Sequence, residues 1–143
     1  MNKHRKQILI DRIKQDTGFI QKTNLHMIEL EEGYAKGEVK VDETLLNGMD
    51  MVHGGCLFSV MDTVAGIAAM TYGNQVTTLN GQVHFLRAAK ECEYLYAAAQ
   101  VVKAGRTIIN CNVEVMTEKE KVVCQGSLEY FRLGPLEEAS SDF

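Results

Sequence analysis

The sequence predicts an α+β domain in which one curled antiparallel sheet of five to six strands covers a single long helix. Two observations support this fold class. Residues 56–71 form an almost uninterrupted apolar run whose larger side chains recur at helical spacing. Most of the remaining chain falls into short segments with strand patterns, joined by polar or glycine-bearing turns. An apolar helix and a sheet with one apolar face bury each other, which gives this architecture.

Length and composition are those of one ordinary soluble domain. The chain has 143 residues, so we expect a single domain over residues 1–143 with a substantial core. Its formal net charge of −4 argues against a protein that binds nucleic acid through bulk charge. No apolar run is long enough to span a membrane without a break, and no signal peptide is evident. The predicted location is therefore cytoplasmic.

Cysteines and histidines show no metal-binding pattern. None of the four cysteines belongs to a CxxC motif, and the four histidines are scattered along the chain. We therefore expect buried free thiols in a reducing compartment, no metal ion and no cofactor.

The part of the chain before the long helix predicts one short helix and two strands. Residues 1–20 contain a basic amphipathic helix, which we expect to dock on the domain and to end with Gly18 as its C-cap. Strands are predicted at residues 23–30 and 34–42, with a turn at Gly33 between them. The second strand alternates, and the face that we expect to be buried consists of Ala35, Gly37, Val39 and Val41.

Four further strand patterns follow the long helix, at residues 75–86, 93–103, 107–117 and 121–132. Their short connections, including a turn at residues 118–120, predict successive antiparallel hairpins. Residues 134–143 are acidic and serine-rich, which is typical of a frayed tail.

The long helix has one apolar face and one small, polar face. At 100° per residue the apolar face consists of Leu57, Val60, Met61, Val64, Ile67 and Ala68, and the other face of Gly55, Ser59, Asp62 and Gly66. Because the helix contains no lysine or glutamate, we expect it to be buried nearly all round, with Asp62 buried too. An isolated buried carboxylate is costly unless it is paired, hydrogen-bonded or protonated. Asp62 is therefore either a structural carboxylate with such partners or a functional one.

A glycine-rich loop, residues 47–55, precedes the helix. It places Gly54 and Gly55 at the helix N-terminus, where free N–H groups and the helix dipole favour negative charge. A developing oxyanion at this end and the carboxylate of Asp62 two turns further along make a constellation suited to acyl transfer.

The element order and this motif resemble the hotdog-fold acyl-CoA thioesterases, in particular the branch related to the phenylacetate-pathway enzyme. The resemblance extends over residues 33–133 and rests on Asn47, Gly48, His53-Gly54-Gly55 and Asp62 at the family's spacing. Residues 83–89 resemble the family's strand end, an aromatic and an aliphatic residue followed by Arg-Pro-Ala, with Ala88 in place of the proline.

The resemblance implies hydrolysis of acyl-CoA thioesters and a role for each motif residue. The Gly55 N–H would polarise the thioester carbonyl, and Asn47 would bind that carbonyl or the attacking water. Asp62 would act as general base or as nucleophile, and the sequence does not decide between them. The resemblance also places a hydroxyl at Thr78 that orients the water or the carboxylate. His53 either holds the loop by hydrogen bonds or has a direct chemical role. The structural alternatives are a turn asparagine and a strand threonine.

A basic turn at residues 102–107 is a second part of the resemblance, since the family places a similar turn near the coenzyme A phosphates. We expect Arg106, supported by Gly105, Lys103 and Arg87, to contact these phosphates, because guanidinium groups suit phosphate geometry. The alternative is a solvated hairpin turn.

Helix geometry predicts a site shared between two chains. Gly55 and Asp62 are seven residues apart, so they are separated by about 10 Å along the helix axis. Both groups have to lie within about 3 Å of one reacting carbonyl and its water. Two antiparallel helices about a two-fold axis bring Gly55 of one protomer to Asp62 of the other. We therefore expect a homodimer. We further expect the homodimer to form a homotetramer as a dimer of dimers, and we expect neither nucleic-acid nor membrane partners.

Two other functions stay open. A hydratase or dehydratase on the same scaffold needs a histidine and a carboxylate acting together, whereas His53 and Asp62 fall on different surfaces of the predicted helix. A non-catalytic acyl-CoA sensor is the other alternative. Fewer than 25 residues precede the first predicted strand, too few for a DNA-binding helix-turn-helix, so such a sensor would lack its own DNA-binding part.

Overall fold

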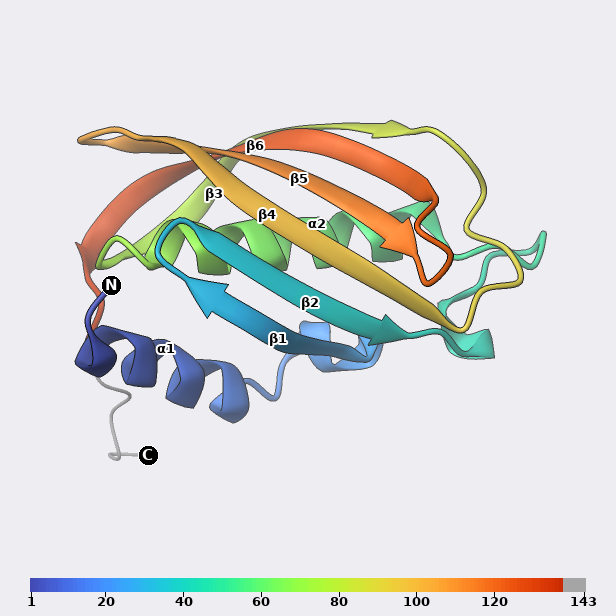
Figure 1. Cartoon of the computed structure of the whole chain (residues 1–143), viewed down its shortest axis with the longest axis horizontal. Coiled ribbons are helices and arrows are strands. Elements are labelled where there is room, and N and C mark those ends of the chain that lie inside the picture. Colours follow the sequence, from blue (N-terminus) through green and yellow to red (C-terminus); the bar gives the residue numbers. More distant parts are fainter. Residues whose placement is uncertain (138–143) are drawn as a thin grey trace.

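Helix α2, Gly54–Met70, lies across the concave face of one curled six-stranded sheet (Figure 1). The computed structural model describes residues 1–137. Its strands are β1 (Leu25–Glu31), β2 (Tyr34–Lys40), β3 (Asn74–Phe85), β4 (Tyr94–Ala104), β5 (Ile108–Thr117) and β6 (Val122–Pro135). All neighbouring strands are antiparallel, in the order β1-β2-β4-β5-β6-β3. The predicted fold class is confirmed.

The predicted apolar face of α2 is the centre of the core. All six predicted side chains are buried, and Met61 and Val64 are fully inaccessible to solvent. They pack on inward-facing strand residues, which include Ala35, Val39, Ala97, Ala99, Val113, Val115 and Leu128. Burial of each large aliphatic side chain stabilises the fold by roughly 1.5–3 kcal/mol. The small alanines on β2 and β4 let the helix lie close to the sheet.

The N-terminal part differs in detail from the prediction. Helix α1 (Lys3–Gln15) is present, but Asp16 with an extended backbone caps it and not Gly18. A short 3₁₀-helix, Phe19–Thr23, follows, so the first strand begins at Leu25. A second 3₁₀-helix, Glu43–Leu45, follows β2. The turn at Gly33 is confirmed, with a φ of +75° that favours glycine.

The predicted series of four strands joined by successive hairpins is wrong at its first connection. Strand β3 pairs with β6 and not with β4, so residues 86–93 cross one end of the sheet to reach β4, the neighbour of β2 (Figure 1). This crossover places β3 at a free edge of the sheet. The two later connections are hairpins as predicted.

The last strand runs further than predicted. Strand β6 continues to Pro135, where we expected it to stop near Arg132, and Asn74 pairs with Pro135 at its end. Proline is tolerated there because it lies at the end of a strand. Most of the predicted frayed tail, residues 138–143, lies outside the described residues.

Candidate active site

The loop before α2 is held by its own polar side chains. The Asn47 side-chain oxygen accepts hydrogen bonds from the backbone N–H groups of Met49 at 2.8 Å and Met51 at 3.2 Å. Asp50 has a φ of +59°, which completes the tight turn. Asn47 therefore acts here as a turn residue through its oxygen, while no described residue accepts a hydrogen bond from its amide nitrogen.

His53 caps the start of α2. The Gly55 N–H, the predicted oxyanion donor, donates to Nδ1 of His53 at 2.8 Å. The predicted loop-holding role of the histidine thus has a specific contact. The same hydrogen bond occupies the N–H that is predicted to polarise a thioester carbonyl. A substrate carbonyl would therefore compete with the imidazole for this N–H.

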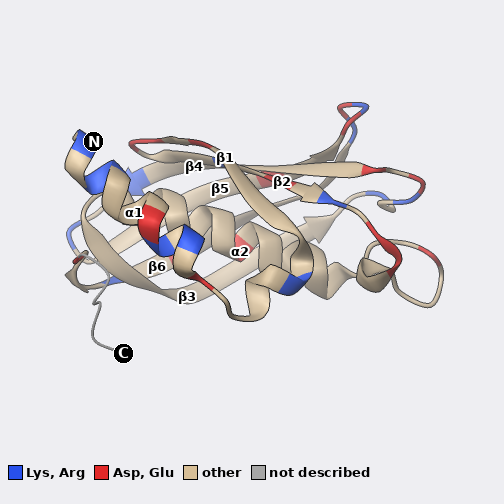
Figure 2. Cartoon of the chain, turned by 90° about the horizontal axis from the view of Figure 1, so that it is seen from below, with Lys and Arg blue, Asp and Glu red and all other residues tan. Residues whose placement is uncertain are grey.

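Asp62 lies on the small, polar face of α2 and is half-buried. The expectation that it is buried with the rest of the helix is wrong for a single chain. The sheet covers only one side of α2, and the opposite side, with Gly55 exposed and Ser59 half-buried, stays accessible. Asp62 is the one charged residue of α2, and Figure 2 shows this helix almost entirely in tan.

Two hydroxyl groups donate to the same oxygen of Asp62. Thr78 donates to Oδ1 at 2.8 Å, which places it as predicted beside the carboxylate, and Tyr130 donates to Oδ1 at 2.9 Å. The Tyr130 hydroxyl also lies 2.8 Å from the backbone carbonyl oxygen of Asp62. Burial, and next the negative charge of Asp62, raise the pKa of Tyr130, so its hydroxyl stays protonated as a donor.

The sheet register brings these hydroxyls together. Thr78 and Tyr130 are direct cross-strand partners on β3 and β6, so both side chains point to the face that carries α2. The register shifts between Thr78 and Asn80, which marks a β-bulge beside the carboxylate. Bulges re-aim side chains and occur often next to active sites.

A groove of about 720 Å³ opens in front of this carboxylate. Asp62, Thr78 and Tyr130 line one part of it. Its other walls come from the second half of α2, the start of β3 and the end of α1, and comprise Thr63, Gly66, Ile67, Met70, Val76, Arg12, Ile13, Gln15 and Asp16. The groove therefore combines a polar centre with an apolar floor, as small-molecule sites do.

The structure does not bring all the predicted residues together in one chain. Gly55 and Asp62 lie on one continuous helix, so the axial separation of about 10 Å holds, and Gly55 does not line the groove. His53 and Asn47 stay with Gly55 in the loop at the far end.

The predicted phosphate contacts also divide into two groups. Lys103, Gly105 and Arg106 lie at the β4–β5 turn, where Gly105 N–H donates to the Ile108 carbonyl. Arg87 lies beyond the other end of β3. Ile108 of β5 and Thr77 of β3 both pair with Phe131 of β6, so they lie at the same level of the sheet. Arg106 lies two residues before this level and Arg87 ten residues after it. The two arginines are therefore about twelve residues apart along the strands, roughly 40 Å. The two arginines of one chain therefore do not contact the same phosphate group.

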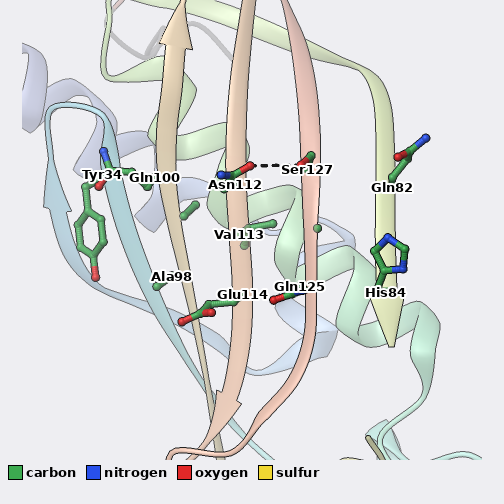
Figure 3. Close-up of a pocket in the computed structure, with 12 residues that line it drawn as sticks. Tyr34, Gln82, His84, Ala98, Gln100, Asn112, Val113, Glu114, Gln125 and Ser127 are labelled. Atoms are coloured by element: carbon green, nitrogen blue, oxygen red, sulfur yellow. Dashed lines mark hydrogen bonds between the residues drawn. The ribbon is translucent and has the colours of Figure 1, made fainter. Parts of the chain in front are cut away.

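Another hollow, of about 520 Å³, lies on the face of the sheet that is turned away from α2. Figure 3 shows mainly polar side chains around it, among them Gln82, His84, Asn112 and Glu114, with Ser127 donating to Asn112 at 3.2 Å. None of the predicted site residues lines this hollow. The sheet separates it from Asp62.

Sequence reasoning missed Tyr130 and the α1 residues of the groove. Tyr130 falls at a buried position of an alternating strand, where an aromatic residue is ordinary core. Only the pairing of β3 with β6 places it opposite Thr78. The α1 side chains have no motif that links them to Asp62.

The fold and this site define a hotdog-fold protein with a carboxylate on its central helix, and comparisons with known proteins agree. The model of the thioesterase superfamily matches residues 49–124, more than half of the chain. The chain therefore belongs to the thioesterase superfamily. None of the helices described here is long and apolar enough to cross a membrane.

Relatives of the phenylacetate-pathway type are among the similar proteins, which confirms the predicted resemblance. The acyl-coenzyme A thioesterase PaaI of Escherichia coli is 29% identical over 110 residues, covering 77% of this chain and 79% of PaaI. The solved structure of that protein matches with a TM-score of 0.86 over 92% of this chain and 96% of its own, at 25% identity. A putative esterase of Archaeoglobus fulgidus is 26% identical over 90% of this chain and 86% of its own.

A structure with a bound ligand is also similar. A Streptococcus mutans UA159 protein solved with acetyl CoA matches with a TM-score of 0.75 and 25% identity, over 78% of this chain and 90% of its own.

Proposed function

We propose that this chain hydrolyses acyl-CoA thioesters to a carboxylic acid and coenzyme A. The observation that carries the proposal is the carboxylate of Asp62, held by two hydroxyls at the wall of an apolar-floored groove. The activity named for E. coli PaaI and the acetyl CoA in the S. mutans structure support this substrate class. Coenzyme A is part of the substrate, and no step of the proposal uses a cofactor or metal.

In the proposed reaction Asp62 acts as a general base on water. The water oxygen forms a bond to the thioester carbonyl carbon while its proton passes to the carboxylate. The carbonyl oxygen gains negative charge, which the Gly55 N–H stabilises, and the carbon–sulfur bond then breaks. The thiolate of coenzyme A leaves and takes up a proton. Direct attack by the carboxylate would instead form an anhydride that water hydrolyses.

The proposal includes a homodimer, because Gly55 and Asp62 of one helix are too far apart for one carbonyl. Strand β3 supports this part, since it is a twelve-residue edge strand whose outer edge is unpaired in one chain. Long open edges usually pair or are covered. Pairing of two β3 edges about a two-fold axis would lay the open faces of the two α2 helices side by side. The dimer of dimers and the cytoplasmic location stay predictions.

A hydrolysis screen tests this function. The wild-type protein is incubated with a panel of short-, medium- and long-chain acyl-CoA and aryl-CoA esters, and released thiol is measured. We expect turnover of at least one ester. Tight binding of an ester without any thiol release would instead favour the acyl-CoA sensor.

A further inference from the structure

The hydroxyl of Tyr130 is placed to act on the side chain of Asp62 and not only on the helix backbone. Tyr130 is 1% exposed, and its hydroxyl lies between the carboxylate Oδ1 and the backbone carbonyl of Asp62. Within an α-helix that carbonyl already accepts the N–H of the fourth residue on, Gly66. A hydrogen bond to an ionised acceptor is the stronger of the two. The single proton of the hydroxyl therefore goes chiefly to the carboxylate.

Thr78, the cross-strand partner of Tyr130 on β3, donates the second hydrogen bond to the same oxygen. The two donors differ in setting, because Tyr130 is enclosed in the core whereas Thr78 lies on the open edge strand. Among the described residues none donates to the other carboxylate oxygen, Oδ2. The two oxygens of Asp62 are therefore inequivalent, because two hydroxyls hold Oδ1 whereas no described residue holds Oδ2.

We propose that Tyr130 is a positioning residue which, together with Thr78, fixes Asp62 through Oδ1 and leaves Oδ2 as the oxygen that takes the proton from the attacking water. The proposal rests on the proposed thioester hydrolysis. In that step the water proton forms a bond to Oδ2, the water oxygen forms a bond to the acyl carbon, and the thiolate leaves with the electrons of the carbon–sulfur bond. A carboxylate free to rotate would present Oδ2 to the water in only part of its orientations.

Tyr130→Phe is the direct test, because it removes the hydroxyl and keeps the buried ring. We expect kcat to fall roughly 10- to 100-fold, while KM changes less than twofold, since the hydroxyl orients the base and does not touch the substrate. Tyr72→Phe is the matched control. It makes the same chemical change on a half-buried tyrosine whose hydroxyl lies beside Gly33, and we expect it to keep wild-type kcat.

A second measurement needs no turnover. Urea unfolding midpoints are compared for wild type, Tyr130→Phe, Asp62→Ala and the double variant. If the hydroxyl bonds the carboxylate, Tyr130→Phe should shift the midpoint less in the Asp62→Ala background than in wild type. Equal shifts in the two backgrounds would show that Tyr130 only fills the core, and would overturn the inference.

The outcomes separate this inference from the proposed function. A wild-type protein without turnover refutes the hydrolase function and with it the catalytic part of the inference. An active wild type whose Tyr130→Phe variant keeps its kcat refutes the positioning role alone. A fall in kcat that Tyr72→Phe reproduces has the same meaning, because a general loss of rigidity would then explain it.

Discussion

The Nδ1 atom of His53 accepts the backbone N–H of Gly55 at 2.8 Å, so the predicted oxyanion donor is already engaged in the free protein. An imidazole nitrogen at this place acts as a helix N-cap, which stabilises a helix by satisfying one of its free N–H groups. The same hydrogen bond therefore stabilises the loop and decides whether the Gly55 N–H is free to bind an oxyanion. A substrate carbonyl competes with the histidine for the same proton.

We predict that His53→Ala lowers stability more than it lowers catalysis. Loss of the cap should reduce the free energy of unfolding by about 0.5–2 kcal/mol. Because the Gly55 N–H remains in place, kcat should fall less than tenfold on a substrate that the wild type hydrolyses. Urea unfolding and steady-state kinetics measure the two effects. His53→Asn, which keeps a capping oxygen, is the matched control and should recover most of the stability. If a folded His53→Ala protein lost 100-fold or more in kcat, the histidine would instead have a chemical role.

We predict that Asp62→Ala abolishes turnover while the protein stays folded. The carboxylate is half-buried, so its removal opens no large cavity in the core. Asp62→Asn keeps the shape but cannot take up a proton, and kcat should fall on the order of 10²-fold or more. Steady-state kinetics with circular dichroism of each variant provides the measurement. A variant that keeps most of its kcat would make Asp62 a structural residue.

The sequence predicted local structure well, because hydrophobic periodicity depends on near neighbours. The period of 3.6 residues predicts which face of α2 is buried. The six apolar residues that it places on this face, between Leu57 and Ala68, are all buried in the structure. The strand segments were also found within a few residues. These predictions required no knowledge of which elements meet.

Features that depend on distant contacts could not be predicted in the same way. The pairing of β3 with β6 joins segments about fifty residues apart, and it alone places Tyr130 opposite Thr78. The exposure of Asp62 depends on what covers the open face of α2, which the pattern of one helix does not specify. The site motif thus pointed to the carboxylate and one of its donors but not to the second donor.

We predict that the buried thiols make the protein less stable in alkali. Burial raises the pKa of Cys111 and Cys124 to about 12 each, above the value near 8.5 of a thiol in an unfolded chain. Because the folded pKa is the higher one, the unfolded state loses its protons first as pH rises. The stability that these neutral thiols contribute is therefore complete below about pH 8.5 and is lost progressively from there toward pH 12.

Urea unfolding at a series of pH values from 7 to 10.5 checks this prediction. The matched comparison is Cys111→Ala, which should be less stable at neutral pH but should lose less stability per pH unit above pH 9. Cys56, which is half-buried, provides a control site, and Cys56→Ala should keep a pH slope closer to that of the wild type. Identical slopes for all three proteins would contradict the role of the buried thiol.

We predict that Arg106 binds the phosphates of coenzyme A at the β4–β5 turn. Arg106→Ala should raise KM about 3- to 10-fold and lower kcat by less, because an exposed charge contact to the nucleotide contributes on the order of 1 kcal/mol to binding. The increase should shrink at high ionic strength, where exposed charges are screened. KM measured at low and high salt tests both points, with the exposed Lys22→Ala as a cation-removing control. Equal KM values for wild type and Arg106→Ala at low salt would exclude this turn from the site.

The distance between Gly55 and Asp62 leads to the last prediction, that two inactive variants restore activity when they are mixed. If one chain supplies the N–H and the other the carboxylate, Asp62→Ala damages one part of each site and Gly55→Pro the other. Proline removes the N–H that now bonds His53, and it is tolerated in the first turn of a helix. Each parent dimer then has two damaged sites.

Random reassociation of equal amounts should leave about half of the dimers mixed, each with one wild-type site and one doubly damaged site. Activity should therefore recover to roughly a quarter of the wild-type value, if the two sites act independently. Both parents first have to be shown to be folded dimers that exchange subunits, by size-exclusion chromatography and mass spectrometry of tagged chains. Gly55→Ala, which keeps the N–H, is the matched control for the oxyanion variant. With these controls in place, a mixture as inactive as its parents would locate the whole site within one chain.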